Sequence, residues 1–224
     1  MVAARLFSDA DRIAIADAVR AAERTTTGEI VPVVASTSDT YERAEDLVGL
    51  ATALLAFSVT WLLGQGLVPA ADWDVEHELA LELPLLLGVL VAGWWLGVLL
   101  ARLSPPLKRL FLPRRVAGAR VLIAAHHAFD ALHVKSTAAA TGVVIYVSLF
   151  ERQVCVCADR AVAQKIGEAE WVRACTMLIE ALQRGQPCQG FVAAIQHVGK
   201  VLAAQFPAAP GDRDELANEL HILD

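Results

Sequence analysis

The chain has 224 residues, of which 56% are hydrophobic, and a formal net charge of −6. Its mean hydropathy of +0.48 is too high for an ordinary soluble domain and indicates contact with lipid. The sequence contains no nucleophile motif, no phosphate-cradling glycine loop and no nucleic-acid signature, so none of these function classes is predicted.

The first soluble part covers residues 1–46 and begins with a helix. Ser8 precedes the alanine-rich segment 9–24, and Asp11 follows three residues later, as in a capping box. This pattern predicts a helix over residues 9–24.

The next predicted element is a short strand over residues 29–35, EIVPVVA. Pro32 has no N–H to donate to a neighbouring strand, so we expect an edge position or a bulge. Asp39 or Thr40 is placed to cap a second helix, which would run directly into the apolar segment that follows.

Two apolar segments then interrupt the soluble sequence. Residues 47–71 and 83–101 contain no ionisable side chain, and about 20 apolar residues are enough for a helix to cross a bilayer. We therefore predict a transmembrane hairpin over residues 47–101, with spans at 47–69 and 83–101.

Four residues in the second span bear on how the two spans pack. Trp94 and Trp95 lie in its middle, where we expect them to contact the first span. Gly93 and Gly97 form a small-x-x-x-small pair that allows close helix approach, although such a pair is equally often a chance occurrence.

The distribution of charge predicts the orientation of the hairpin. The link at residues 71–82 carries five carboxylates and neither Lys nor Arg, whereas six Lys or Arg residues follow the second span up to residue 120. Positive residues remain on the cytoplasmic side. The predicted protein is therefore a two-pass protein of the inner (cytoplasmic) membrane, with both termini cytoplasmic and the acidic link outside.

The second soluble part covers residues 102–207, and residues 208–224 form a polar tail that we expect to be loosely ordered. Ser104-Pro105-Pro106 ends the second span, and Glu151-Arg152 favours a tight turn between two strands. The predicted elements are a helix at 116–133, strands at 141–150 and 153–160, and helices at 168–183 and 190–205.

The four cysteines fit a reducing compartment. Cys155 and Cys157 are two residues apart in a strand, so they share one face and are poorly placed for a disulfide. Cys175 and Cys188 lack zinc-ligand spacing, and we expect buried, apolar cysteines.

Neither soluble part has enough strands for a core of its own, because a lone strand needs partners. Both parts lie on the same side of the predicted membrane. We therefore predict one cytoplasmic domain whose sequence is interrupted by a two-helix anchor.

Short motifs in both soluble parts occur in an order that resembles TPM-domain proteins. This family takes its name from a thylakoid lumen protein, a photosystem II repair protein and an acetylcholine-receptor auxiliary protein. The motifs are Phe7-Ser8, residues 22–30, Tyr41, Thr141-Gly142-Val143, Glu151-Arg152, Ala158-Asp159, Trp171, Gly190 and Phe206-Pro207.

The resemblance implies an α/β fold in which a small mixed sheet is sandwiched by helices, here interrupted by the transmembrane hairpin. One plant member of the family is described as an acid phosphatase, and others act in the assembly or maturation of membrane complexes. Bacterial members include membrane-anchored proteins with this split layout. The resemblance also makes Asp159 the first candidate for a metal or phosphate site.

Asp159 stands at the end of a predicted strand and before a helix, where α/β sites often form. Its alternative role is the N-cap of that helix. Glu29 begins the first strand and is a second candidate at the same edge. The cofactor expected there is a divalent cation, Ca²⁺ or Mg²⁺, and no cofactor is certain.

A second candidate metal site is AHHAFDALH, in which His126, Asp130 and His133 fall at i, i+4 and i+7 of the predicted helix and so share one face. Imidazole and carboxylate groups are metal ligands, but the alternative is a solvated polar face. Neither His127 nor Asp39 gains a catalytic role from its spacing, and Glu151 and Arg152 are interpreted as a surface turn pair.

A basic flank follows the second span and could contact anionic lipid. Its charged residues are Lys108, Arg109, Arg114 and Arg115.

Three functions are compatible with these features, and the sequence leaves open whether the protein is an enzyme. We favour a membrane-anchored binding or assembly module with a membrane protein complex or membrane-associated partner. The alternatives are a divalent-metal-dependent phosphatase and a structural subunit of a membrane complex. Nucleic acid is not an expected partner.

Overall fold

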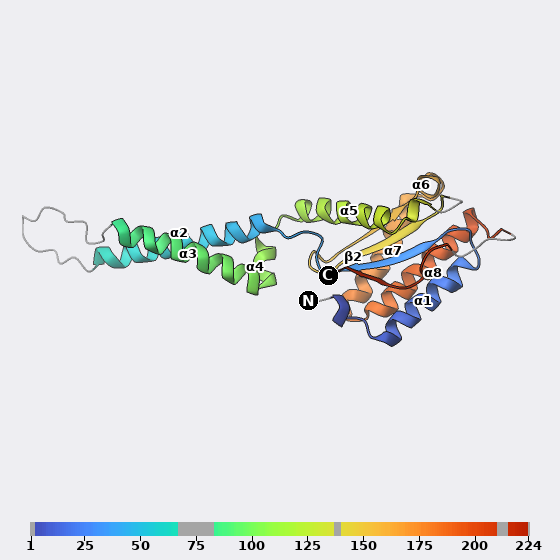
Figure 1. Ribbon diagram of the computed structural model, residues 1–224, viewed down its shortest axis with the longest axis horizontal. Helices are drawn as coiled ribbons and strands as arrows, with labels where there is room; N and C mark the ends of the chain where they lie inside the picture. Colours follow the sequence, from blue (N-terminus) through green and yellow to red (C-terminus); the bar gives the residue numbers. More distant parts are fainter. Residues whose placement is uncertain (1–2, 67–82, 137–139, 210–214, 224) are drawn as a thin grey trace, which may run out of the picture. The chain divides into compact units, whose positions relative to one another are not determined.

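The computed structural model describes residues 3–66, 83–136, 140–209 and 215–223 (Figure 1). The chain divides into two units, which are described separately. One comprises residues 1–39 and 117–224, and the other comprises residues 40–116.

The first unit is built on a four-stranded mixed sheet with the strand order β3-β2-β1-β4. Strands β1 (Ile30–Ala35) and β2 (Val143–Ser148) are parallel, with Ile30 opposite Val143. Strand β3 (Gln153–Ala158) is antiparallel to β2. One strand from before the apolar segments therefore pairs with one from after them, as a split domain requires.

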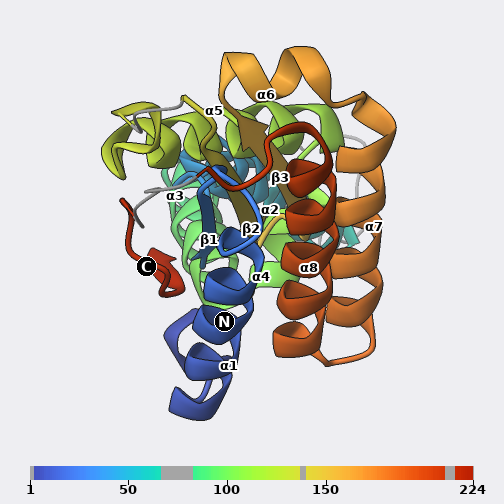
Figure 2. The same ribbon diagram turned by 90° about the vertical axis from the view of Figure 1, so that its right-hand side faces the viewer.

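Helices cover both faces of this sheet (Figures 1 and 2). Helix α5 (Arg114–Ala131) lies on one side, and α1 (Asp9–Glu23), α7 (Glu168–Gln183) and α8 (Pro187–Gln205) lie on the other. Because both faces are covered, every residue of β1 and β2 is buried. The predicted fold class, a small mixed sheet sandwiched by helices, is confirmed.

Each face of the sheet has its own apolar core. Ile30 and Val34 of β1 pack with Ile15, Leu178 and Ile195 of the three-helix side. The alternate residues pack with α5; this set comprises Val31, Val33, Val121, Ala125 and Phe129.

Three short elements complete the unit: η1 (Ala3–Arg5), η2 (Val134–Ser136) and α6 (Arg160–Lys165). The predicted capping box at the start of α1 is confirmed. The Ser8 side chain accepts a hydrogen bond from the backbone N–H of Asp11, and the Asp11 carboxylate accepts one from the backbone N–H of Ser8.

The prediction that Pro32 marks an edge strand or a bulge is wrong, because β1 lies between β2 and β4 (His221–Leu223). Val143 donates to the carbonyl of Glu29 and Leu149 to that of Ala35, so alternate residues from Glu29 to Ala35 face β2. Pro32 therefore faces the β4 side. Pairing with β4 begins only at Val33, so no hydrogen bond is lost at Pro32.

The expectation of a loosely ordered C-terminal tail is also wrong for its last residues. His221–Leu223 forms β4, parallel to β1. The backbone N–H of Ser36 donates to the carbonyl of Leu223 over 2.9 Å and extends this pairing past the end of β1.

The second unit contains two helices that are long and apolar enough to cross a bilayer, α2 (Glu42–Gly66) and α3 (Leu83–Leu103). The acidic link at residues 71–82 lies outside the described residues. A third, short helix, α4 (Pro105–Leu110), follows at Ser104, where the sequence predicts only a break.

The two long helices pack through glycines, so the small-x-x-x-small pair has a packing role. A Cβ placed on Gly97 would lie 2.7 Å from the Cα of Gly49, and one on Gly93 would lie 2.9 Å from the Cα of Ala53. Trp94 packs on Gly49, as expected. Trp95 is 62% exposed, so the expectation that it packs against the first span is wrong.

All four cysteines are free thiols. The sulfurs of Cys155 and Cys157 lie 3.8 Å apart on one face of β3. Cys157 is buried, and the other three are half-buried. Burial raises the pKa of both Cys175 and Cys188 to about 11, so these thiols remain protonated and unreactive at neutral pH.

Candidate functional site

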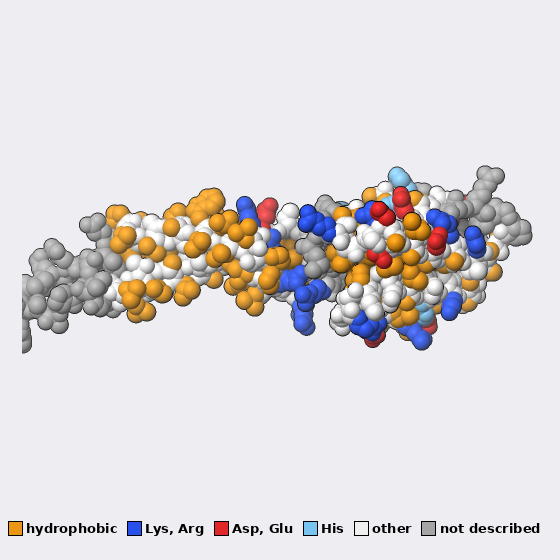
Figure 3. Space-filling model, turned by 90° about the horizontal axis from the view of Figure 1, so that it is seen from below, with side chains coloured by type: hydrophobic (Ala, Val, Ile, Leu, Met, Phe, Trp, Pro, Cys, Tyr) orange, Lys and Arg blue, Asp and Glu red, His pale blue; other side chains and the backbone are white. Residues whose placement is uncertain are grey.

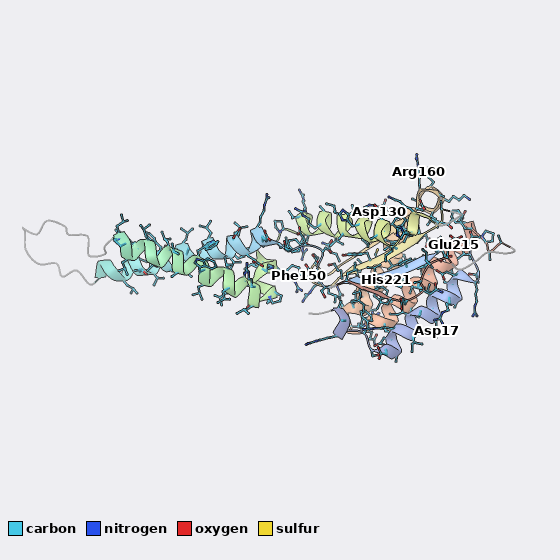
Figure 4. The ribbon with its side chains drawn as sticks, viewed as in Figure 1. Asp17, Asp130, Phe150, Arg160, Glu215 and His221 are labelled. Carbon is cyan, nitrogen blue, oxygen red and sulfur yellow. The ribbon has the colours of Figure 1, made fainter. Side chains whose placement is uncertain are left out.

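The carboxyl ends of β1 and β2 meet at one edge of the sheet because the two strands are parallel. In open α/β sheets, ligands bind outside this edge. Here β1 is followed by residues 36–39 and β2 by the turn at Leu149–Arg152, which leads into β3. Figure 4 shows Phe150 in this turn and Arg160 after β3 at opposite ends of the sheet.

A single carboxylate holds the loop after β1 in place. Oε1 of Glu151 accepts a hydrogen bond from the backbone N–H of Ser38 over 2.9 Å and lies 3.4 Å from the Thr37 hydroxyl, which donates to the carbonyl of Asp39 over 2.9 Å. Oε2 of Glu151 accepts one from the Ser148 hydroxyl. The interpretation of Glu151 and Arg152 as a surface turn pair is therefore wrong for Glu151, which ties two loops together across the edge of the sheet.

Three hydroxyl groups form a chain that ends on this carboxylate. Ser38 Oγ donates to Ser148 Oγ over 2.9 Å and lies 3.3 Å from the Tyr146 hydroxyl. Each hydroxyl has one proton, so Tyr146 donates to Ser38, Ser38 to Ser148, and Ser148 to Glu151. All polar groups along the chain have partners, which makes the arrangement rigid.

Tyr146 is the innermost member of the chain. Burial, reinforced by the negative charge of Glu151, raises the pKa of its hydroxyl above the ordinary value. The phenol therefore remains neutral and able to donate at physiological pH.

Charged side chains stand beside this network. Nε of Arg120, on α5, lies 3.0 Å from Oδ2 of Asp39. Asp39 is thus engaged with α5 rather than acting as the predicted cap of the next helix, and α2 begins only at Glu42. His127 is on the same side of α5 as Arg120, two turns further along the helix.

A groove of about 410 Å³ runs from this edge of the sheet along α5, as far as Leu132. Its apolar lining comes mainly from α5 and from the last residue of β4, and its polar lining consists of Thr37, Ser38, Asp39, Arg120, His127 and Tyr146. The apolar residues are Ile123, Ala124, Ala128, Ala131, Leu132 and Leu223. We call it the α5 groove.

The sequence does not single out the α5 groove, because its polar residues come from three separate segments. Asp39 and His127 gain no role from spacing, yet the fold places both in the lining. The available signal is the run Thr37-Ser38-Asp39, a set of small polar residues directly after a buried strand.

Asp159 and Glu29 lie at the opposite end of the sheet. Asp159 caps α6, with Oδ1 accepting from the N–H of Arg160 over 2.8 Å. Oδ2 of Asp159 is buried without a hydrogen-bond partner among the described residues. Glu29 is buried, and its Oε1 accepts from the N–H of Glu215 over 3.3 Å.

The backbone hydrogen bonds of the sheet show how Glu29 and Asp159 lie relative to each other. The backbone N–H of Val143 donates to the carbonyl of Glu29, and the backbone N–H of Asp159 donates to the carbonyl of Gly142. The start of strand β2 therefore lies between Glu29 and Asp159. Within the described residues, no three His, Cys, Asp or Glu side chains are grouped closely enough to hold a metal ion. The Asp159 and Glu29 site therefore remains a prediction.

His126, Asp130 and His133 do not share one helix face, and this expectation is wrong. Helix α5 ends at Ala131, and His133 has a left-handed backbone with a φ of 56°. Asp130 lies 2.5 Å from Nζ of Lys135. The hydrogen bond from Lys135 lowers the pKa of Asp130, which is engaged in this exposed ion pair.

The fold is that of a mixed α/β domain, with a four-stranded sheet between helices. The chain is similar in structure to the BA42 protein of the psychrophilic bacterium Bizionia argentinensis, solved by NMR, with a TM-score of 0.57 and 19% identity over 96% of this chain and 94% of that one. No protein-family model and no curated protein matches the chain.

Proposed function

We propose that this protein is a bacterial, membrane-anchored member of the TPM family. We further propose that its split domain is a binding or assembly module for a membrane-associated protein, and that the α5 groove is where the partner binds. The observation that carries the proposal is the groove itself. It begins at the carboxyl ends of two parallel strands, where a rigid polar network meets the apolar wall formed by α5.

The chemistry of the groove suggests what it accepts. One wall offers exposed apolar surface at Ile123, and the other offers the exposed Thr37 and the half-buried Ser38. Asp39 and Arg120 supply both signs of charge at the side. A protein segment that presents an apolar side chain next to hydrogen-bonding groups fits this lining better than a purely ionic ligand does.

The test is photo-crosslinking in intact native cells, with a photoreactive amino acid in place of Ile123. Val172 on α7 provides the matched control, since it is similarly exposed, at 56% against 49% for Ile123. We expect a defined adduct with a membrane-associated protein from position 123 and none from position 172.

Two outcomes would count against a binding groove. Equal adducts from both positions would indicate non-specific contact. Adducts formed only from Trp95, on the exposed side of α3, would favour the alternative of a structural subunit whose hairpin packs within a larger complex.

The proposed location is the inner (cytoplasmic) membrane, with two spans and both termini cytoplasmic. The charge asymmetry around the two long helices supports it. We expect a single cysteine introduced within residues 71–82 to react with an impermeant maleimide on intact spheroplasts. Reaction only after lysis would contradict this orientation.

The second candidate function is a divalent-metal-dependent phosphatase centred on Asp159. The buried, unpartnered Oδ2 of Asp159 is the observation that favours it. The described residues around this atom do not supply a three-ligand set, so no catalytic step is derived from a metal here.

For an aryl phosphate, we expect no turnover above background by the purified full-length protein, with or without Mg²⁺ or Ca²⁺. We also expect no difference between the wild type and Asp159→Asn, which keeps the helix cap. The readout is released phosphate. Metal-dependent release that disappears in Asp159→Asn would instead identify Asp159 as a ligand and replace the binding proposal with the enzyme.

A further inference from the structure

Helix α4 is fixed to the end of the hairpin by a shared carboxylate. Nζ of Lys108 lies 2.6 Å from Oε1 of Glu45 and donates to the carbonyl of Thr40 over 3.1 Å. Nε of Arg102, at the end of α3, lies 2.9 Å from Oε2 of Glu45. Glu45 therefore joins α2, α3 and α4 at one point.

This arrangement changes the expected role of Lys108. The sequence places Lys108 in a lipid-facing basic flank, but its side chain is only 17% exposed and bound to Glu45. Lys108 therefore acts as a tether for α4. Of the other predicted members of the flank, Arg114 and Arg115 are exposed.

The tether gives α4 a particular direction. Figure 1 shows α4 running across the axes of α2 and α3, after the turn at Ser104. If α2 and α3 cross a bilayer, a helix across their axes lies along the membrane plane. Since only Ser104 separates α4 from α3, it can lie no further away than the headgroup layer.

The surface of this segment combines apolar and basic groups. Leu103 and Leu110 are 71% and 77% exposed, although large apolar side chains favour burial. Lys and Arg side chains gather at the same end of the hairpin (Figure 3). Exposed leucines beside arginines are the composition of a segment that lies in the membrane interface.

We propose that α4 and the residues that follow it, 105–115, form an interfacial segment that binds anionic phospholipid. The lipid belongs to the leaflet that holds the start of α2 and the end of α3. Leu103 and Leu110 insert between acyl chains, and Arg114 and Arg115 bind lipid phosphate. Glu45 supplies no competing charge because it is occupied by Lys108 and Arg102.

The test uses the full-length protein in proteoliposomes that contain spin-labelled phosphatidylglycerol or phosphatidylcholine. Electron paramagnetic resonance then measures the fraction of lipid immobilised by the protein. Because each basic residue near an anionic surface contributes on the order of a few-fold in affinity, we expect phosphatidylglycerol to be preferred by roughly threefold or more. In Arg114→Gln/Arg115→Gln this preference should fall to near parity.

The control is Arg160→Gln/Arg173→Gln, which removes the same charge from exposed positions on α6 and α7. This variant should keep the wild-type preference. Equal immobilisation of both lipids by the wild type, or an equal loss of preference in the two double variants, would overturn the proposal. Displacement of the lipid by inorganic phosphate beyond that by chloride at equal ionic strength would identify a soluble-anion site and overturn it as well.

This inference rests on the proposed membrane insertion but not on the α5 groove. The two failures are distinguishable. Extraction of the protein from the vesicles by alkaline carbonate would contradict the proposed membrane insertion. Protein that stays in the vesicles without a preference for phosphatidylglycerol contradicts only the lipid site.

Discussion

Glu151→Ala is expected to release the loop at residues 36–39 from the edge of the sheet. Two hydrogen bonds to a carboxylate are lost, and the buried Ser148 hydroxyl loses its acceptor. Hydrogen bonds to charged groups and unsatisfied buried groups predict a loss of roughly 2–4 kcal/mol in the free energy of local opening. Hydrogen exchange followed by mass spectrometry on peptides covering β1 and this loop measures the change.

Glu180→Ala is the matched control, because within the described part of the chain the Glu180 side chain forms an exposed i,i+4 ion pair with Arg184 and no other ion pair. Such pairs contribute about 0.5 kcal/mol or less, so exchange in β1 should be unchanged. Unaltered exchange in Glu151→Ala would show that the carboxylate does not hold the loop. In that case the rigid wall of the α5 groove would need another cause.

Gly97→Leu is expected to separate α2 from α3 at their closest approach. Its Cβ would lie 2.7 Å from the Cα of Gly49 and 2.7 Å from Oγ1 of Thr52, and backbone atoms cannot yield as a flexible side chain can. Overpacking of this kind costs typically 1–3 kcal/mol and more where backbones collide. We expect a clear fall in the temperature at which the detergent-solubilised protein aggregates.

Gly88→Leu in the same helix makes the control. Apart from its own helix backbone and chain neighbours, no heavy atom of the described residues lies within 4 Å of a Cβ at Gly88, so the added side chain meets open space there. Its aggregation temperature should stay near that of the wild type. If Gly88→Leu and Gly97→Leu behaved alike, the packing of α2 on α3 through Gly49 and Gly97 would be contradicted.

The sequence is sufficient to predict the elements that are marked by a long, continuous pattern of apolar residues. The uncharged segments predict α2 and α3, and α7 has the predicted bounds, Glu168–Gln183. Helix α2 begins at Glu42, before its apolar stretch, because a helix can continue through polar residues once it leaves the apolar layer.

The elements that were missed depend on distant partners. Strand β4 has only three residues, too few for a recognisable alternation, and exists because β1 offers it a free edge. The role of Glu151 depends on Thr37 and Ser38, more than a hundred residues earlier in the chain. No local pattern shows such a contact.

The predicted His126, Asp130 and His133 site depends on where helix α5 ends. The helix ends two residues before the predicted end, and this difference removes the basis for the site. The three side chains share a face only if the helix reaches His133, whereas α5 ends at Ala131. The position of a helix end is often uncertain by one or two residues. Spacing near a predicted helix end is therefore a weak basis for a ligand set.

The central claim is that the α5 groove binds a partner, and filling the groove tests it most directly. Ala131 is exposed and lines the groove, so Ala131→Trp blocks it without entering the core. Ala169→Trp adds the same side chain to an exposed position on α7. We predict that the adduct formed from position 123 is lost in Ala131→Trp and retained in Ala169→Trp. An adduct that survives in both variants would contradict the account.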